Sequence, residues 1–343
     1  MTRIFLSEDE VDYIRSVLES LQLRLKSAED DDFLNNACLY AHQLPFRLRK
    51  CLNDFKLLES DNAVLMFSGY PIKNERIGLT PTHWNSRPEL SPTLEEEMLL
   101  ILFGSLLGEP LGWATQQNGH IVHDILPIKA HEEEQLGTGS SQTLYWHNED
   151  AFHPYRGDYI CILCLRNPDR VATTYVSIDM VEISEAHKKI LFERRFVIRP
   201  DESHLEKNRG RRPGEMEADD PLLASAYERI RRMNECPPKL AVLFGDPAAP
   251  YLRIDPYFMD PLDDQEAQSA LDSFVNAIES KLTEVILEPG DVLCIDNYRA
   301  VHGRHPFKPQ YDGQDRWLKR INVARDIRKS RDARRSPESR IIL

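Results

Sequence analysis

The motif His147-Asn148-Glu149 constrains the fold of this chain more than any other feature. It directly follows residues 144–146, an apolar run with two aromatic residues that is typical of a β-strand. A second histidine, His302, lies far downstream. Two imidazoles and one carboxylate can hold a metal ion on one face and leave the opposite positions open, as an Fe(II) site that activates oxygen requires. The pattern therefore predicts a fold in which two strand regions far apart in the sequence lie side by side around one metal ion.

Arg316, fourteen residues after His302, adds a group that can bind an organic anion. Its planar guanidinium can form two parallel hydrogen bonds with the carboxylate of a co-substrate. With the three candidate ligands, this indicates an oxygenase that depends on Fe(II) and 2-oxoglutarate. The plainer alternative for Arg316 and for Arg320 is a surface salt bridge with Asp312 or Asp315, which contributes ~0–1 kcal/mol.

Two other classes of protein remain open for the same residues. Two histidines and a glutamate can also hold Zn²⁺ for hydrolysis, and such a site does not consume 2-oxoglutarate. A non-catalytic β-helix protein could bind an amino acid and release no succinate. Two further His-x-Glu pairs, His131 with Glu133 and His204 with Glu206, lie in polar stretches that are typical of loops. We do not interpret them as ligands.

Composition excludes several other classes. The chain has 343 residues, 41% of them hydrophobic, which is enough for one large domain or two smaller ones. The formal net charge of −13 argues against a nucleic-acid partner. No apolar run approaches the ~20 residues that a membrane-spanning helix needs, and residues 1–10 lack the apolar segment of a signal peptide. We expect a cytoplasmic protein with no membrane partner, and self-association into a homo-oligomer is left open.

The six cysteines are scattered and, without a secretion signal, are expected to be reduced thiols. Cys161 and Cys164 have the spacing of a redox motif, but they lie inside the apolar run 159–165. Residues three apart on a strand face opposite sides of a sheet, so we interpret both as buried structural residues.

The order of elements follows from local patterns. Ser7, with Glu10 three residues later, has the form of a capping box at the start of an amphipathic helix. Between about residues 112 and 172, short apolar runs alternate with turn residues, which is typical of a sandwich or barrel. The expected helices are about 11–25, 37–57, 94–107, 184–194, 221–233 and 264–284, and the expected strands are 121–122, 125–126, 144–146, 159–165, 241–244, 252–254, 292–295 and 316–323.

These elements predict an α+β fold with a double-stranded β-helix (jelly roll) core wrapped by helices. We expect one domain over residues 1–343, with a helical part at 1–110, the core at about 111–180 and 241–325, and a helical insertion at 181–240. Within the insertion, the charged stretch 201–220 is either a solvated loop or a lid over substrate. The basic tail, residues 325–340, is expected to be a solvated end.

Six longer motifs extend the pattern around the candidate ligands. They are WATQQ at 113–117, WHNEDAF at 146–152, LRNPD at 165–169, VATT at 171–174, DNYRAVHGR at 296–304 and YDGQDRWLKRIN at 311–322. Together they resemble the clavaminate synthase-like oxygenases, and among these the hydroxylases of free amino acids: the arginine β-hydroxylase of viomycin biosynthesis, asparagine oxygenase and the lysine hydroxylases. The resemblance runs from about residue 32 to residue 328.

The resemblance implies a role for each candidate site residue. His147, Glu149 and His302 would bind Fe(II), and Arg316, with the Thr173 hydroxyl, would hold the distal carboxylate of the co-substrate 2-oxoglutarate. O2 would be the second co-substrate. The substrate contacts implied are Arg320 for the α-carboxylate, Gln116 and Glu149 for the α-amino group, Asp201, Ser203 and Asp255 for the side chain, and Leu136 as a closing residue.

Two further expectations concern substrate and reaction. The arginine hydroxylases carry a second aspartate two residues after the position of Asp255, and here that position is Tyr257. A phenol and fewer acids suit a compact ammonium group, so L-lysine is the first candidate, with L-arginine or ornithine as the alternative. Related halogenases have a small residue in place of the carboxylate, so Glu149 predicts hydroxylation, with succinate and CO2 as co-products.

Overall fold

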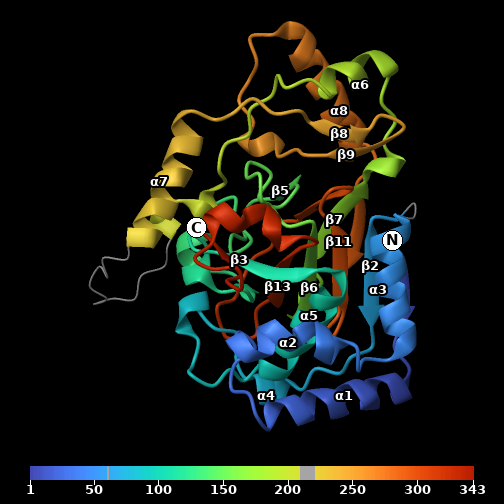
Figure 1. The fold of residues 1–343 in the computed structure, drawn as a ribbon, viewed down its shortest axis with the longest axis vertical. Helices are drawn as coiled ribbons and strands as arrows, with labels where there is room; N and C mark the ends of the chain where they lie inside the picture. The colour runs from blue at the N-terminus through green and yellow to red at the C-terminus, as the bar shows by residue number, and fades with distance from the viewer. Residues whose placement is uncertain (60–61, 209–220) are drawn as a thin grey trace.

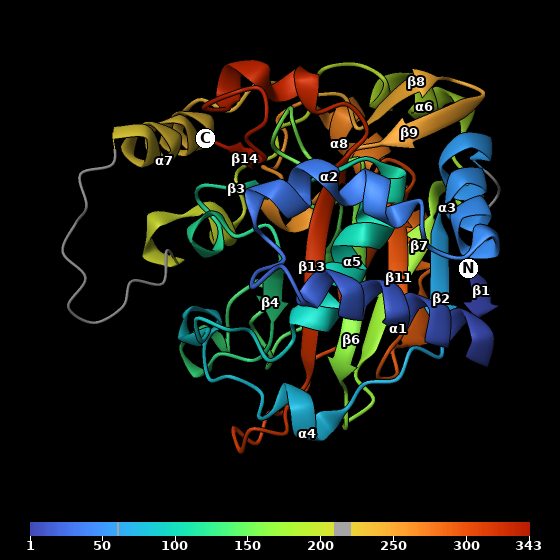
Figure 2. The ribbon, with the colours of Figure 1, turned by 60° about the horizontal axis from the view of Figure 1, so that its bottom comes forward.

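Two β-sheets face one another at the centre of the molecule, and helices cover the outer side of each sheet (Figures 1 and 2). The structure is a computed structural model, and it describes residues 1–59, 62–208 and 221–343. Every structural statement below concerns these ranges. No helix within them combines the length and apolar character that crossing a membrane requires.

The larger sheet has eight strands in the described part of the chain, and most neighbouring strands are antiparallel. Strand β13 lies next to β6, β3 and β4, and it carries the segment that begins just after Arg316. In order across the sheet the strands are β1 (Thr2–Phe5), β2 (Val64–Ser68), β11 (Val292–Asp296), β6 (Tyr159–Arg166), β13 (Trp317–Ala324), β3 (Glu109–Trp113) and β14 (Ile341–Ile342), and β4 (His123–Ile125) pairs with β13 off this path.

The smaller sheet carries the two predicted histidine ligands on adjacent strands. His302 on β12 lies directly opposite His147 on β5, so pairing of the strands brings together residues far apart in sequence. A separate two-stranded hairpin lies above this sheet in Figure 1. The four strands in order are β10 (Thr283–Ile286), β7 (Ala172–Ser177), β12 (Ala300–Arg304) and β5 (Leu144–His147), and the hairpin is β8 (Leu243–Asp246) with β9 (Ala249–Leu252).

Apolar side chains from both sheets fill the space between them. Ile162 on β6 and Leu293 on β11 meet Tyr175 on β7 and Val285 on β10 in one buried cluster. Burial of this kind stabilises the fold by roughly 25 cal/mol per Å² of apolar surface removed from water. The apolar fill holds the two sheets together beside the polar side chains described below.

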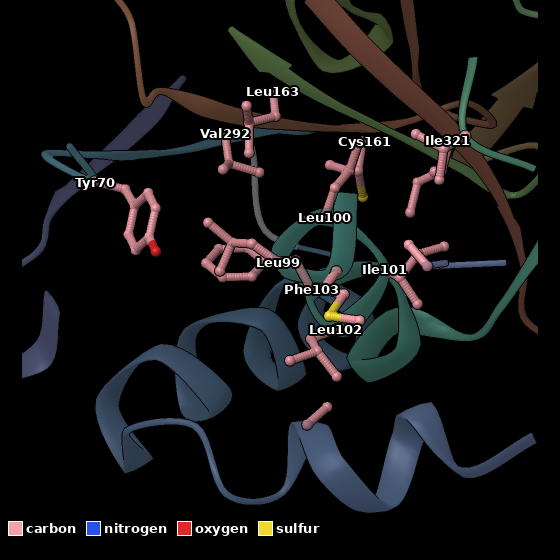
Figure 3. Packing of buried hydrophobic residues seen from close by; sticks show 14 of the residues in the cluster. Tyr70, Leu99, Leu100, Ile101, Leu102, Phe103, Cys161, Leu163, Val292 and Ile321 are labelled. Carbon is pink, nitrogen blue, oxygen red and sulfur yellow. The ribbon is translucent and has the colours of Figure 1, made fainter. Parts of the chain in front are cut away.

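The outer face of the larger sheet is covered by the N-terminal helices. Helix α5 (Leu94–Leu107) is apolar on all sides and lies between the sheet and these helices, as Figure 3 shows for Leu99 to Phe103. The helix predicted over 94–107 is thus confirmed, and so is the capping box of Ser7 and Glu10. The other helices on this side are α1 (Glu8–Gln22), α2 (Asp31–Ala41), α3 (Phe46–Leu58) and α4 (Asn74–Ile77).

The second helical layer packs against the smaller sheet. Helices α6 and α8 contact one another, and a buried cluster joins them to Trp146 and Val301. These helices are α6 (Glu185–Leu191) and α8 (Gln265–Glu279), whereas α7 (Pro221–Glu235) packs through Ile230 against Ala151, Phe152 and Ile198. The short 3-10 helices are η1 (Trp84–Ser86), η2 (Gln117–Gly119), η3 (Lys129–His131), η4 (Ile178–Met180), η5 (Glu202–His204), η6 (Glu206–Asn208), η7 (Pro256–Phe258) and η8 (Ile327–Ala333).

Two local expectations are corrected, and one pair of strands was not predicted. The helix predicted over 37–57 is two helices, because Pro45 lacks the N–H that a continuous helix needs and instead caps α3. The parallel pair β1–β2 was not predicted. The basic tail is only partly solvated: Arg328 and Arg331 are exposed, whereas Arg334 is buried and donates to backbone carbonyls, and β14 pairs with β3. Of the expected loop or lid at 201–220, residues 209–220 lie outside the described ranges.

Both redox-spaced cysteines are buried, as predicted. Cys161 belongs to the cluster under α5, and Cys164 belongs to the cluster between the sheets, so they face opposite sides of β6.

The expected jelly-roll core with covering helices agrees with the two facing sheets. The proposed division into one domain with an insertion at 181–240 stays a prediction.

Candidate metal and substrate site

One cavity collects every residue that the sequence pointed to. His147 ends β5 and His302 lies in β12, while Glu149 follows β5 by two residues. Alternation along β12 turns the side chains of His302 and Arg304 to the same side. Lining residues that matter below are Gln116, His123, Leu136, His147, Glu149, Asp150, Thr173, Asp201, Ser203, Asp255, Tyr257, His302, Arg304, Arg316 and Arg320.

The donor atoms of His147, Glu149 and His302 suit one divalent ion. The Glu149 Oε2 atom lies 3.7 Å from His147 Nε2 and 3.6 Å from His302 Nε2, and the three donor atoms all lie within 4.8 Å of one another. The Nδ1–H of His147 donates to the Tyr145 carbonyl at 2.8 Å, which leaves the Nε2 lone pair for a metal. Two imidazoles and a carboxylate with an open side are the donor set that non-haem Fe(II) takes.

Two buried asparagines hold the segment that carries Glu149. The Asn297 side chain accepts from the Glu149 N–H at 2.8 Å and donates to the Glu149 carbonyl at 3.0 Å. Asn148 donates to the carbonyls of Asn297 and Ala300, both at 2.9 Å, and accepts from the Ile254 N–H. Sequence reasoning missed this role, although both amides lie inside the quoted motifs.

Charges around the three candidate ligands set their protonation. Burial raises the pKa of Glu149, but Arg320 and His147 outweigh it and hold the pKa well below its usual range. Burial and the charge of His147 lower the pKa of His302 to about 3. Burial lowers the pKa of His147, yet Glu149 and Asp255 raise it overall to about 9. A metal ion that binds here therefore displaces one proton, from His147, at neutral pH.

Arg316 is a buried cation in the wall of the same cavity. Its side chain is 4% exposed, and no carboxylate of the described residues lies within ion-pair distance of it. Burial lowers its pKa to about 10, which still leaves it charged at neutral pH. Asp315, one of the expected surface partners, instead accepts from the Gln310 N–H at 2.7 Å. A buried guanidinium of this kind needs an anion from outside the protein.

Thr173 and Arg304 lie beside this cation. They face one another across β7 and β12, and both are buried. The guanidinium of Arg304 donates to backbone carbonyls, including that of His305 at 2.9 Å, and burial together with the charge of Arg316 lowers its pKa to about 9. This part of the cavity is therefore strongly cationic.

Arg320 contacts Glu149 directly. It donates from Nη1 to Glu149 Oε1 and from Nη2 to His123 Nδ1 at 2.9 Å, while its buried Nε–H has no partner. His123 lies 3.0 Å from the His120 carbonyl through Nε2, and burial and the charge of Arg320 lower its pKa well below the usual range. His123 is thus neutral and fixes Arg320, a role that the sequence did not indicate.

The opposite charge gathers at Asp255 and Asp201. Asp255 is 6% exposed, and no lysine or arginine of the described residues forms an ion pair with it. Asp201 accepts from the Ser203 N–H at 2.9 Å and from its hydroxyl. Leu136 is buried in the cavity wall, whereas Tyr257 is 55% exposed at the rim. The structure therefore does not bury the phenol beside Asp255.

His204 is the largest departure from the sequence interpretation. It was expected in a solvated loop, but its side chain is fully buried and lies 2.9 Å from Asp150 through Nε2 and 2.7 Å from the Thr115 hydroxyl through Nδ1. Gln116 donates from Nε2 to the Ser203 hydroxyl at 2.5 Å and to Asp150 at 3.3 Å. A buried histidine is not visible in a polar local sequence, because its partners Thr115 and Asp150 lie far away in the sequence, in the turns that follow β3 and β5.

The chain is similar in sequence to a family of dioxygenases and to several amino-acid hydroxylases. The chain matches the model of the family described as taurine catabolism dioxygenase TauD, TfdA family over residues 93–322. It is 43% identical to an enduracididine β-hydroxylase of Streptomyces hygroscopicus over 343 residues and 41% identical to an L-ornithine/L-arginine 3-hydroxylase of Catenulispora acidiphila over 345 residues, with 100% of both chains covered in each case. An L-lysine 3-hydroxylase of the latter species is 28% identical, over 89% of this chain and 79% of that one.

A solved structure shows the same fold over the whole chain. The non-haem iron oxygenase OrfP, in complex with Fe, succinate and (3S)-hydroxy-L-Arg, superposes with a TM-score of 0.93 at 43% identity, and 100% of each chain is covered. This superposition confirms the predicted oxygenase fold over the part of the chain that the structure describes.

Proposed function

The chain belongs to the TauD/TfdA family and is an Fe(II)- and 2-oxoglutarate-dependent oxygenase, and we propose that it hydroxylates a free basic L-amino acid, with arginine or ornithine as the first candidates. The observation that carries the proposal is one cavity that holds two imidazoles, a carboxylate and a buried arginine that forms no ion pair with any described residue. Each of these groups has a use in that chemistry.

The metal and co-substrate contacts come first. His147, Glu149 and His302 hold Fe(II), and Arg316 pairs with the distal carboxylate of 2-oxoglutarate while the Thr173 hydroxyl adds a hydrogen bond. Iron, when bound with 2-oxoglutarate and O2, supplies the oxidation of a C–H bond, which side chains alone cannot perform. The protein contributes a fixed donor set, a charged anchor for the oxoacid and exclusion of water.

The substrate contacts use the remaining charges. The free Nε–H of Arg320 is available to the α-carboxylate, and Gln116 with Glu149 receives the α-amino group. Asp255, with Asp201 and Ser203, faces the cationic side chain, because a buried carboxylate without a basic partner is stabilised by a cation. The buried side chain of Leu136 forms an apolar part of the cavity wall beside the substrate. The substrate is thereby held at both ends, and this fixes which methylene faces the metal.

Arginine or ornithine now stands ahead of lysine, which the sequence interpretation placed first. Two relatives named for basic substrates, one of them for ornithine and arginine, are above 40% identical, whereas the lysine 3-hydroxylase is 28% identical. The argument for lysine rested on Tyr257, and this side chain is 55% exposed at the rim. A rim phenol selects weakly between an ammonium and a guanidinium.

Incubation of the purified protein with Fe(II), 2-oxoglutarate, ascorbate and single amino acids tests the proposal. We expect L-arginine or L-ornithine to give a product about 16 Da heavier, the mass of one oxygen atom, and lysine to react more slowly. Product from neutral amino acids alone would contradict the basic substrate. Binding without succinate formation would favour a non-catalytic protein, and hydrolysis with Zn²⁺ would favour a zinc enzyme.

A further inference from the structure

Asp150 and His204 form a fully buried pair beside the cavity. Both side chains are 0% exposed, and His204 Nε2 lies 2.9 Å from Asp150 Oδ1. Asp150 Oδ2 also accepts from the Trp113 indole N–H at 2.7 Å and from the Asn322 amide at 3.2 Å. The Thr115 hydroxyl contacts the other nitrogen of His204, and the Trp113 ring packs edge-on against it. A pair with this many partners holds one geometry.

The pair determines which way the Gln116 amide points. Gln116 Nε2 lies 2.5 Å from the Ser203 hydroxyl oxygen, 3.0 Å from His204 Nε2 and 3.3 Å from Asp150 Oδ1, so its two hydrogens face these three groups. Gln116 Oε1 is buried, and no donor among the residues that the structure describes forms a hydrogen bond with it. Gln116 lines the cavity and is 3% exposed, so its carbonyl is an unused acceptor within the protein. An unpaired buried acceptor costs about 1–3 kcal/mol unless a donor arrives with a ligand.

The pair also fixes the segment that carries two substrate contacts. Asp201 and Ser203 lie within three residues of His204, and Asp201 caps η5. Asp150 directly follows Glu149, a candidate metal ligand. His204 therefore connects this segment to the strand end that carries the metal site.

We propose that the Asp150–His204 pair is a positioning device that aims the Gln116 carbonyl at the α-ammonium group of the substrate and holds Ser203 against Gln116. The inference rests on the proposed function, because it names how that site selects an α-amino acid. Neither residue touches the reacting atoms; both act through Gln116. An amino acid with a free α-ammonium supplies the donor that Gln116 Oε1 lacks.

Binding to the intact protein, loaded with Fe(II) and 2-oxoglutarate without oxygen, provides a test that does not depend on turnover. Titration calorimetry compares L-arginine with 5-guanidinopentanoate, which lacks only the α-amino group. We expect wild type to bind L-arginine about ten- to a hundredfold more tightly, since hydrogen bonds to charged groups contribute about 1.5–3 kcal/mol. His204→Leu should lose most of this preference and leave the Kd of 2-oxoglutarate within about twofold.

Milder variants keep the test valid if His204→Leu does not fold. Thr115→Val removes one partner of His204, and His204→Gln can still donate to Asp150 and should retain part of the preference. His42→Leu, at an exposed histidine, is the matched control and should behave as wild type. In a double-mutant cycle, Gln116→Leu combined with His204→Leu should reduce the preference for L-arginine about as much as Gln116→Leu alone, because both substitutions act through one contact.

The outcomes separate the inference from the function on which it rests. If wild type binds neither ligand, the proposed function is wrong and the inference is overturned with it. If wild type binds L-arginine and His204→Leu weakens both ligands equally, the pair only supports the fold and the inference alone is overturned. Loss of the preference in Thr115→Val and His204→Leu, with partial recovery in His204→Gln, would support it.

Discussion

Asp255 is buried and forms no ion pair with a lysine or arginine of the described residues, and this makes its ionisation sensitive to pH. Burial raises its pKa to about 7, with His147 opposing and Asp201 reinforcing the shift. A cationic substrate needs the ionised carboxylate of Asp255, so a proton competes with the substrate for this group. Affinity should therefore be low below the pKa and reach its full value above it. We predict that KM for the basic amino acid falls about tenfold from pH 6 to pH 8, as the ionised fraction rises from about a tenth to about nine tenths.

Steady-state kinetics at saturating Fe(II) and 2-oxoglutarate measure this effect. Asp255→Asn should bind the substrate weakly at every pH and show a flat KM profile, while its KM for 2-oxoglutarate stays near wild type. A wild-type slope that survives in Asp255→Asn would assign the titration to another group.

Substitution of Arg316 should weaken the binding of 2-oxoglutarate and leave the binding of the amino acid nearly unchanged. Arg316→Gln removes a charge-assisted, two-pronged contact, so KM for 2-oxoglutarate should rise about a hundredfold, as the loss of about 3 kcal/mol implies. KM for the amino acid should change little. Arg170→Gln is the control, because Arg170 is 62% exposed in a surface salt bridge. Equal loss of affinity for both substrates in Arg316→Gln would argue that Arg316 supports the fold rather than the oxoacid.

At this scale the sequence identified groups with distinctive chemistry and missed those that support them. His147, Glu149, His302 and Arg316 were predicted because their chemistry suits an open iron site with an oxoacid and because longer motifs around them resemble a known oxygenase family. Asn297, His123 and His204 were missed, since a polar side chain is assigned a positioning role only when its distant partner is known. Charge patterns alone also could not show that Asp255 is buried while Tyr257 is not.

Among the elements, β13 shows how one strand serves two environments. Arg320 points into the cavity, and the next residue toward the N-terminus, Lys319, points to the helical side, as alternation requires. Lys319 is 2% exposed, and its Nζ lies 2.6 Å from Asp124 Oδ1 and 2.9 Å from Glu97 Oε1. The ion pairs tie α5 and β4 to the strand that carries Arg320.

Lys319→Met should test that connection. Two carboxylates would lose their shared cation, so the free energy of unfolding in urea should fall by about 3–5 kcal/mol. Lys329→Met, at a side chain that is 59% exposed, is the control and should change stability by less than about 0.5 kcal/mol. A change below 1 kcal/mol in Lys319→Met would show that Arg87 alone compensates Asp124.

The elements that the sequence predicted are those with a strong local pattern. Helix α5 has an unbroken apolar run after acidic residues in its first turn, and α1 has a capping box with regular apolar spacing. The parallel pair β1–β2 joins segments about sixty residues apart, and β14 pairs with β3 from the other end of the chain. Such pairings depend on tertiary contacts, which a local pattern does not encode.

For the whole molecule, two facing sheets provide one cavity with charge of opposite sign on different walls. Arg304 and Arg316 supply the cationic wall, and Asp201 and Asp255 supply the anionic wall, with the candidate metal ligands in the same cavity. This arrangement suits a dicarboxylic oxoacid and a basic amino acid bound together. The fold class was predictable because strands near both histidines implied a jelly roll, whereas the burial of Arg334 and the pairing of β14 with β3 were not.

The ratio of succinate to hydroxylated amino acid, measured by mass spectrometry with L-arginine or L-ornithine, tests the central claim most directly. That claim is that one iron held by His147, Glu149 and His302 couples the decarboxylation of 2-oxoglutarate to substrate hydroxylation. We predict a ratio near one for wild type and no hydroxylated product in His147→Ala or His302→Ala. Product formation near the wild-type rate in either variant, or product without consumption of 2-oxoglutarate, would contradict the account.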